Sequence, residues 1–195
     1  MRAVMRPLLA LALVLLFFAP AEAQRRARAQ AGGSFDVYGA FGAGGSIDGP
    51  GFDVDLDTTL GFGVRYIATQ GNGQALLGPM LEVLAWQADA PDADRRVILD
   101  PGLFLGIGQR FQRRRLGWEI YGAFPITFAY ASDFPGRDAS GLGFSVGALL
   151  GNKLWIGRRL ALLVEVGWRL HQLFDDGDGA TFQQAGINAG VALDL

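Results

Sequence analysis

Strict alternation of apolar and polar residues near the C-terminus most constrains how this chain folds. From Leu160 to His171 every second residue is large and apolar, and most positions between carry small or charged residues such as Glu165 and Arg169, with Leu163 as an exception. Residues 185–195 repeat the pattern, with Ala, Ile and Val on one parity and Gly, Asn and Asp on the other. Successive side chains of a strand point to opposite faces. The pattern therefore predicts strands that face lipid on one side and a polar lumen on the other.

The N-terminus predicts export from the cytoplasm. Arg2 and Arg6 precede an apolar run over residues 8–19, and an Ala-Glu-Ala sequence follows at 21–23. This is the form of a secretory signal peptide, and the run is shorter than the ~20 residues of a spanning helix. We expect a signal peptide at 1–23, a basic linker at 24–33 and a barrel domain at 34–195. Cleavage nearer Ala31 is an alternative.

Composition narrows the functional classes. The formal net charge is −2, and removing residues 1–23 takes away two Arg and one Glu, which leaves −3. Such a chain has no large basic field for nucleic acid. With no cysteine it has no disulfide, thiolate metal site or lipidated cysteine. Glycine is abundant, at 29 residues, and only 18% of residues are charged, which is low for a soluble surface.

The spacing of turn residues predicts an up-and-down barrel. Connections after the second, fourth and sixth segments are short, whereas those after the first, third, fifth and seventh carry Asp, Pro and Gly. Short turns at one rim and longer loops at the other are typical of outer-membrane barrels, with both termini on the periplasmic side. The expected strands are 34–45, 53–68, 74–88, 95–111, 115–131, 140–156, 159–173 and 181–195.

Two further features bear on this prediction. Aromatic residues on the apolar parity are expected to form two interfacial girdles: Tyr66, Phe111 and Trp118 near the short turns, and Phe128, Tyr130 and Trp168 near the loops. Pro79, Pro101 and Pro125 fall inside expected strands, where each removes a ladder donor and suggests a bulge. A soluble β-sandwich with one apolar face is the alternative to a membrane barrel.

On strand pattern, strand count and the apolar final strand, residues 34–195 resemble the small eight-stranded outer-membrane barrels of the OmpA/OmpX type. The resemblance implies an all-β, antiparallel, up-and-down transmembrane barrel inserted by the barrel-assembly machinery. Members of that family usually end in Phe, where this chain has Leu195.

Charged residues on the polar parity are the candidate site. An eight-stranded barrel has an interior just wide enough for its own side chains, and charges held there must pair. We expect a structural, mutually neutralising plug, drawn from Asp36, Asp55, Asp57, Arg65, Glu82, Asp100, Arg110, Glu119, Lys153, Glu165, Arg169, His171 and Asp194.

Catalytic and metal-binding interpretations are weaker. His171, the single histidine, could act as a general base in a lipid-modifying enzyme. However, its parity points inward. Asp175, Asp176 and Asp178 suggest calcium, but the distal Glu of an EF-hand loop is missing and Asp-Gly is ordinary turn chemistry. We expect no enzyme activity, no metal and no cofactor.

The sequence therefore predicts a monomeric barrel in the outer membrane of a Gram-negative bacterium. Its expected partners are membrane lipid, lipopolysaccharide and the assembly machinery, and its expected role is structural or interactive. A lipid-modifying enzyme, a small-solute channel and a soluble periplasmic ligand binder remain as alternatives.

Overall fold

The computed structural model describes residues 32–49, 52–70, 75–87, 95–113, 116–132, 141–157, 159–175 and 178–195. The expected signal peptide and most of the expected linker lie outside the described residues, while Gly32 and Gly33 already belong to the first strand. Across the described ranges, no helix has the length and hydropathy needed to cross a membrane.

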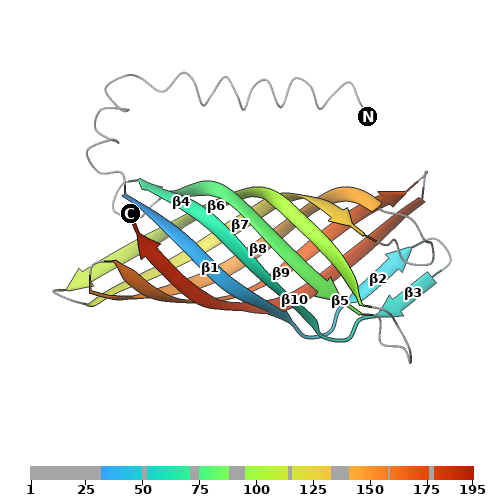
Figure 1. The fold of residues 1–195 in the computed structure, drawn as a ribbon, viewed down its shortest axis with the longest axis horizontal. Coiled ribbons are helices and arrows are strands. Elements are labelled where there is room, and N and C mark those ends of the chain that lie inside the picture. The colour runs from blue at the N-terminus through green and yellow to red at the C-terminus, as the bar shows by residue number, and fades with distance from the viewer. Residues whose placement is uncertain are drawn as a thin grey trace, which may run out of the picture. The chain divides into compact units, whose positions relative to one another are not determined.

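Eight long strands form a closed antiparallel barrel, which confirms the predicted fold class (Figure 1). Each strand pairs with the next along the chain, and the first pairs with the last. The predicted boundaries hold to within a few residues, except near residue 55. The barrel strands are β1 (Gly32–Gly42), β4 (Thr59–Gln70), β5 (Ala75–Trp86), β6 (Arg96–Arg113), β7 (Leu116–Ala131), β8 (Gly141–Ile156), β9 (Leu160–Asp175) and β10 (Asp178–Asp194).

The strands are tilted, and the register gives the size of the tilt. Gly39 of β1 pairs directly with Ala189 of β10. In the opposite direction, the row of paired residues that starts at Gly39 crosses β4, β5, β6, β7, β8 and β9 in turn and reaches β10 at Gly179. Along β10, Gly179 is ten residues away from Ala189 (189 − 179). For eight strands this stagger gives a narrow barrel whose lumen side chains can fill.

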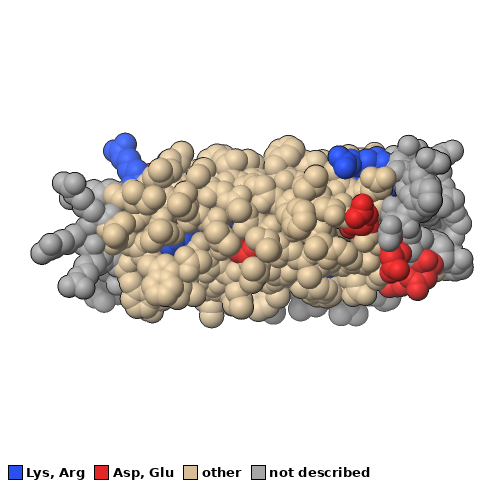
Figure 2. Space-filling view, turned by 90° about the horizontal axis from the view of Figure 1, so that it is seen from below, with Lys and Arg blue, Asp and Glu red and all other residues tan. Residues whose placement is uncertain are grey.

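Inward and outward faces follow the predicted parity. Along β9, Val164 is 51% exposed, whereas Glu165 beside it is 1% exposed. Among the described side chains of the barrel strands, none on the outward parity is charged, and the wall in Figure 2 is almost entirely tan between its two ends. A band of this kind is what a bilayer requires of a spanning strand.

The prolines interrupt the hydrogen-bonded ladder but do not create bulges, so the bulge prediction is wrong. Next to Pro125, the β7–β8 pairs stop at Ala123↔Leu149 and resume at Ile126↔Val146 in the same register. The gaps beside Pro79 and Pro101 also leave the register unchanged. Each proline therefore removes one backbone N–H donor from the ladder without adding an extra residue to its strand.

A hairpin at the loop end corrects the predicted second strand. Residues 53–68 do not form one strand, because β2 (Ser46–Gly49) and β3 (Phe52–Asp55) form a hairpin and the barrel strand β4 begins only at Thr59. β2 pairs with residues 181–183 of β10, near the loop end of that strand (Figure 1). Gly44 and Gly45, with φ of 68° and 147°, turn the chain out of β1 in conformations that other residues rarely adopt.

Candidate functional site in the barrel lumen

Arg65 of β4 is the centre of a buried charge network in the barrel. Its Nε lies 2.9 Å from Asp36, and its Nη2 lies 2.7 Å from Glu165. Tyr121 donates to the same Glu165 oxygen at 2.6 Å, and Asn188 donates to the other at 2.9 Å. The guanidinium also lies 4.2 Å from the Phe104 ring centroid. This group therefore has both charge partners and a stacking surface, which a buried cation requires.

Lys153 of β8 extends the network toward the short-turn end. Its Nζ lies 2.9 Å from Asp36 and 3.0 Å from the Ser34 hydroxyl oxygen. Ser34 in turn donates to Asp36 at 2.9 Å. Asp36 is thus shared between two cations, Arg65 and Lys153, and all three ionic side chains are at most 1% exposed.

A second ionic group lies toward the loop end. Glu82 of β5 accepts a hydrogen bond from Arg169 of β9 at 2.8 Å and one from Tyr38 of β1 at 2.8 Å. His171 Nε2 lies 2.7 Å from Asp100 Oδ2, and Arg169 lies 3.8 Å from the same carboxylate. The five side chains come from four strands, so the interactions tie opposite walls of the barrel together.

At the short-turn end, an aromatic side chain and a looser ion pair fill the opening. Arg110 lies 3.6 Å from Asp194, and their side chains are 22% and 29% exposed. The Arg110 guanidinium also lies 4.0 Å from the Trp155 ring centroid. Trp155, itself buried, donates to Glu119 at 3.1 Å. These two ionic residues line the mouth rather than the interior of the lumen.

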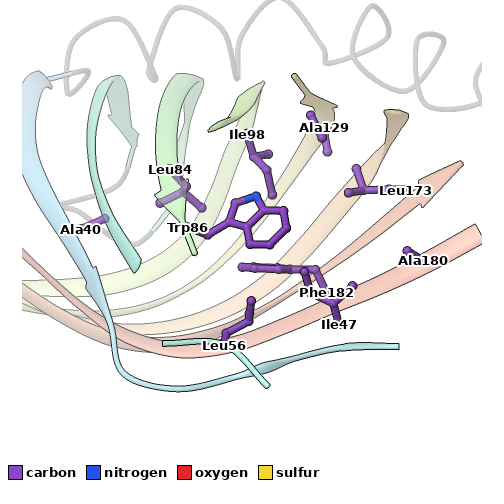
Figure 3. Packing of buried hydrophobic residues seen from close by; sticks show 11 residues of the cluster. Ala40, Ile47, Leu56, Leu84, Trp86, Ile98, Ala129, Leu173, Ala180 and Phe182 are labelled. Atoms are coloured by element: carbon purple, nitrogen blue, oxygen red, sulfur yellow. The ribbon is translucent and has the colours of Figure 1, made fainter. Parts of the chain in front are cut away.

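The loop end is closed by an apolar cluster, which we call the cork (Figure 3). Ile47 of β2 and Leu56, which follows β3, point into the barrel and meet Phe182 and Trp86. Phe182 packs edge-on against His171, with 4.9 Å between ring centroids, so the cork contacts the second ionic group directly. The other members are Ala40, Leu84, Ile98, Ala129, Ala131, Leu173 and Ala180.

One small cavity remains between the cork and the charge network. Its volume is about 40 Å³, and Glu82, Arg169, Gln184 and Asn188 are among the residues that line it. The Gln184 amide nitrogen is buried there and has no hydrogen-bond partner in the described protein. A cavity of this size holds at most a few water molecules.

The structure brings together most of the charged residues predicted to fill the lumen. Asp36, Arg65, Glu82, Asp100, Glu119, Lys153, Glu165, Arg169 and His171 are all buried inside. Asp55 and Asp57 are not, and that part of the prediction is wrong. Both are exposed at the hairpin, because β1 and β4 stop pairing at Gly42↔Thr59 and the chain then leaves the barrel wall.

Several uncharged members of the network were not predicted as such. Tyr38, Tyr121, Ser34 and Asn188 donate to its carboxylates, and Trp155 donates to Glu119. Parity in the sequence could have identified three of them as lumen residues. Ser34 and Tyr38 share the inward parity of Asp36, and Tyr121 shares that of Glu119.

The side chains that could carry chemistry are held in contacts with other lumen residues. Ser34 lies beside Lys153, but Lys153 donates to the Ser34 hydroxyl oxygen and to Asp36, and the Ser34 hydroxyl donates to the same carboxylate. His171 has a carboxylate partner and is fully buried. No cluster of three or more potential metal ligands exists within the described ranges. Asp175 and Asp178 are the terminal pair of β9 and β10, and Asp176 lies outside the described residues.

Comparison with known proteins supports the fold and no finer assignment. The chain aligns with the outer membrane protein OprG from Pseudomonas aeruginosa at a TM-score of 0.56 and 9% identity, covering 85% of this chain and 96% of that one. The N-terminal barrel domain of OprF from the same organism aligns at 0.42 and 11%, covering 85% and 100%. Neisserial surface protein A aligns at 0.42 and 12%, covering 80% and 96%. No family model and no curated protein matches the sequence.

The alignment with the outer membrane protein OprG has a TM-score above 0.5, and the present chain shares its fold. The resemblance predicted from strand pattern and strand count is therefore confirmed at the level of fold.

Proposed function

We propose that the protein is an outer-membrane barrel with a structural or surface-interaction role and a lumen plugged by its own side chains. The observation that carries this proposal is the continuous filling of the lumen. The cork, the two ionic groups and the Trp155–Arg110 contact follow one another from the loop end to the short-turn end.

The energetics favour a fixed plug over a passage. A hydrated ion passing Arg65 would have to separate it from Asp36 and Glu165, and breaking one partner from a buried pair costs about 3–5 kcal/mol. The cavity of about 40 Å³ beside Glu82 and Arg169 holds at most a few water molecules, which is too few for a continuous water column.

The location and partners belong to the same proposal. An outer wall without charge on its described side chains, an N-terminal segment of signal-peptide form and a closed barrel support export to the outer membrane of a Gram-negative bacterium. Barrel-assembly machinery would insert the chain as a monomer, and lipid with lipopolysaccharide would surround it.

Planar-bilayer recording tests the plug. The wild-type protein, with folding checked by its altered gel mobility before boiling, should show no steady ion conductance. A stable, reproducible conductance at neutral pH would overturn the plugged-barrel proposal and favour a small-solute channel. Recovery of the protein in the soluble periplasmic fraction would favour a soluble binder instead.

A second experiment tests the proposed absence of catalysis. The His171–Asp100 pair is the observation that most favours a lipid-modifying enzyme. Cells that produce wild-type protein and cells that produce His171→Ala should have the same lipid A composition by mass spectrometry. A modification that depends on His171 would promote the enzyme alternative.

A further inference from the structure

The outer wall carries a shallow apolar notch across β7, β8 and β9. Its volume is about 500 Å³, within the range of small-molecule sites. Phe124 and Trp168 project from its sides, and Ala148, paired with Trp168, lies between the two strands that carry them. Gly122, Leu150 and Val166 form the next paired row and complete the outward side chains of the lining.

Small residues create this notch between bulkier neighbours. Ala148 and Gly122 occupy positions where neighbouring strands carry Phe, Leu or Trp. A Cβ atom added at Gly122 would meet nothing closer than 3.9 Å, so a larger residue fits there without strain. The barrel's own packing therefore leaves room on its membrane-facing surface.

Trp168 adds a polar requirement to this apolar site. Its side chain is 42% exposed, and its indole donates no hydrogen bond to the described part of the protein. In the aromatic girdle near the loops, where Trp168 is expected, such an N–H group can donate to groups of the lipid interface. An acceptor from the surroundings, such as the oxygen of a lipid ester or hydroxyl group, would satisfy it.

Polar side chains lie beyond Leu170, on the loop-end side of Trp168. On the outward parity of β9, Leu170 and then Gln172 follow it, and Thr181 of β10 donates to Gln172 at 2.8 Å. Gln183 lies beside them on β10. This row is neutral, so it suits sugar hydroxyl and amide groups better than phosphates.

We infer that the notch binds one acyl chain of an outer-leaflet lipid A molecule. The chain would lie over Ala148 and Gly122, between Phe124 and Trp168. An oxygen near the head of the chain would accept from the Trp168 indole, and the sugar would lie at the Gln172–Thr181–Gln183 row. This inference rests on the proposed outer-membrane function, because the notch is continuous with the wall that would contact lipid.

Native mass spectrometry of the mature full-length protein, released from nanodiscs that contain lipid A and phosphatidylethanolamine, tests the site. The wild-type protein should retain one lipid A molecule. Ala148→Phe, which fills the notch, should lower that occupancy at least fivefold. Trp168→Phe, which keeps an apolar side but removes the donor, should lower it by a smaller factor.

Ala189→Phe is the matched control, because Ala189 is exposed on the outward parity of β10 and does not line the notch. It should retain lipid A as the wild-type protein does. Equal losses in both phenylalanine variants, or retention of phosphatidylethanolamine in place of lipid A, would overturn the inference.

The same samples separate failure of the inference from failure of the proposed function. Failure of the wild-type protein to insert into nanodiscs as a heat-modifiable barrel would contradict the proposed function. An inserted, heat-modifiable barrel that retains no lipid A would contradict the acyl-chain site alone.

Discussion

The middle of the lumen and its loop end are filled by opposite chemistries. Around Arg65 the filling is ionic: Arg65 pairs with Asp36 on the neighbouring strand and, across the lumen, with Glu165 of β9. At the loop end the filling is apolar, and Ile47 and Leu56 come from a hairpin segment that is not part of the barrel wall.

This difference separates two ways of closing a barrel. The ionic middle is produced by the barrel strands themselves, so it cannot open unless buried charges lose their partners. The cork depends on a short hairpin that pairs with β10 over only three residue pairs. The middle should therefore be the more stable closure, and the loop end the region that opens first.

Removing the central cation should have the largest effect. Arg65→Ala leaves Asp36 and Glu165 without their shared guanidinium, and we expect a loss of about 3–5 kcal/mol in unfolding free energy. Urea titration of refolding into lipid vesicles measures it. Arg159→Ala, at an exposed position outside the barrel strands, is the control and should change stability little. Similar losses in the two variants would mean that the network contributes no stability.

The outer wall should show the same contrast between middle and end. Val164→Arg places a charge in the lipid-facing middle of the wall and should cost about 2–4 kcal/mol. Gln172→Arg has the same parity but lies near the loop end, where the cost should be about 0–1 kcal/mol. Equal costs in the same refolding titration would show that the two positions do not differ in membrane depth.

The sequence predicted the middle of the molecule well, because period-two alternation fixes both the wall and the lumen. Once the inward parity of β9 is known, Glu165, Arg169 and His171 must share the lumen with the inward residues of other strands. Which partners meet depends on the stagger of ten residues, which is set by closure of the whole barrel and is not visible in any one segment.

The loop end could not be predicted for a related reason. Residues 53–57 continue the alternation of Val54 and Leu56 with Asp55 and Asp57, so pattern alone extends the strand. The competing signal was local: Gly44 and Gly45 permit the positive φ values that redirect the chain. The pairing of β2 with the loop end of β10 then places Leu56 in the cork and leaves Asp55 and Asp57 exposed.

Weakening the cork should open the loop end without unfolding the barrel. Ile47→Ala in a rigid core would cost about 2–5 kcal/mol, but here we expect the loss to be no more than about 2 kcal/mol, because the hairpin can separate on its own. Hydrogen exchange should accelerate at the Leu56 and Asp57 amides, which donate to Gly45 and Gln87 at 3.0 and 3.1 Å. Equal acceleration in β7 and β8 would show that cork and barrel unfold together.

The smallest expected effect is a pH dependence confined to the hairpin. A hydrogen bond with Asp48 and the negative charge of that residue raise the pKa of the Asp53 carboxyl above 3.8. A raised pKa means that the hairpin with β2 and β3 paired, which holds Asp53 beside Asp48, binds this proton more tightly than the hairpin with the two strands separated. Pairing of β2 with β3 should therefore be most favourable below pH 3.8, and should weaken as the pH rises through the raised pKa. Exchange at the Leu56 amide, corrected for the intrinsic effect of pH, should report the change. Asp53→Asn should abolish it, while a persistent dependence in that variant would assign the titration to another group.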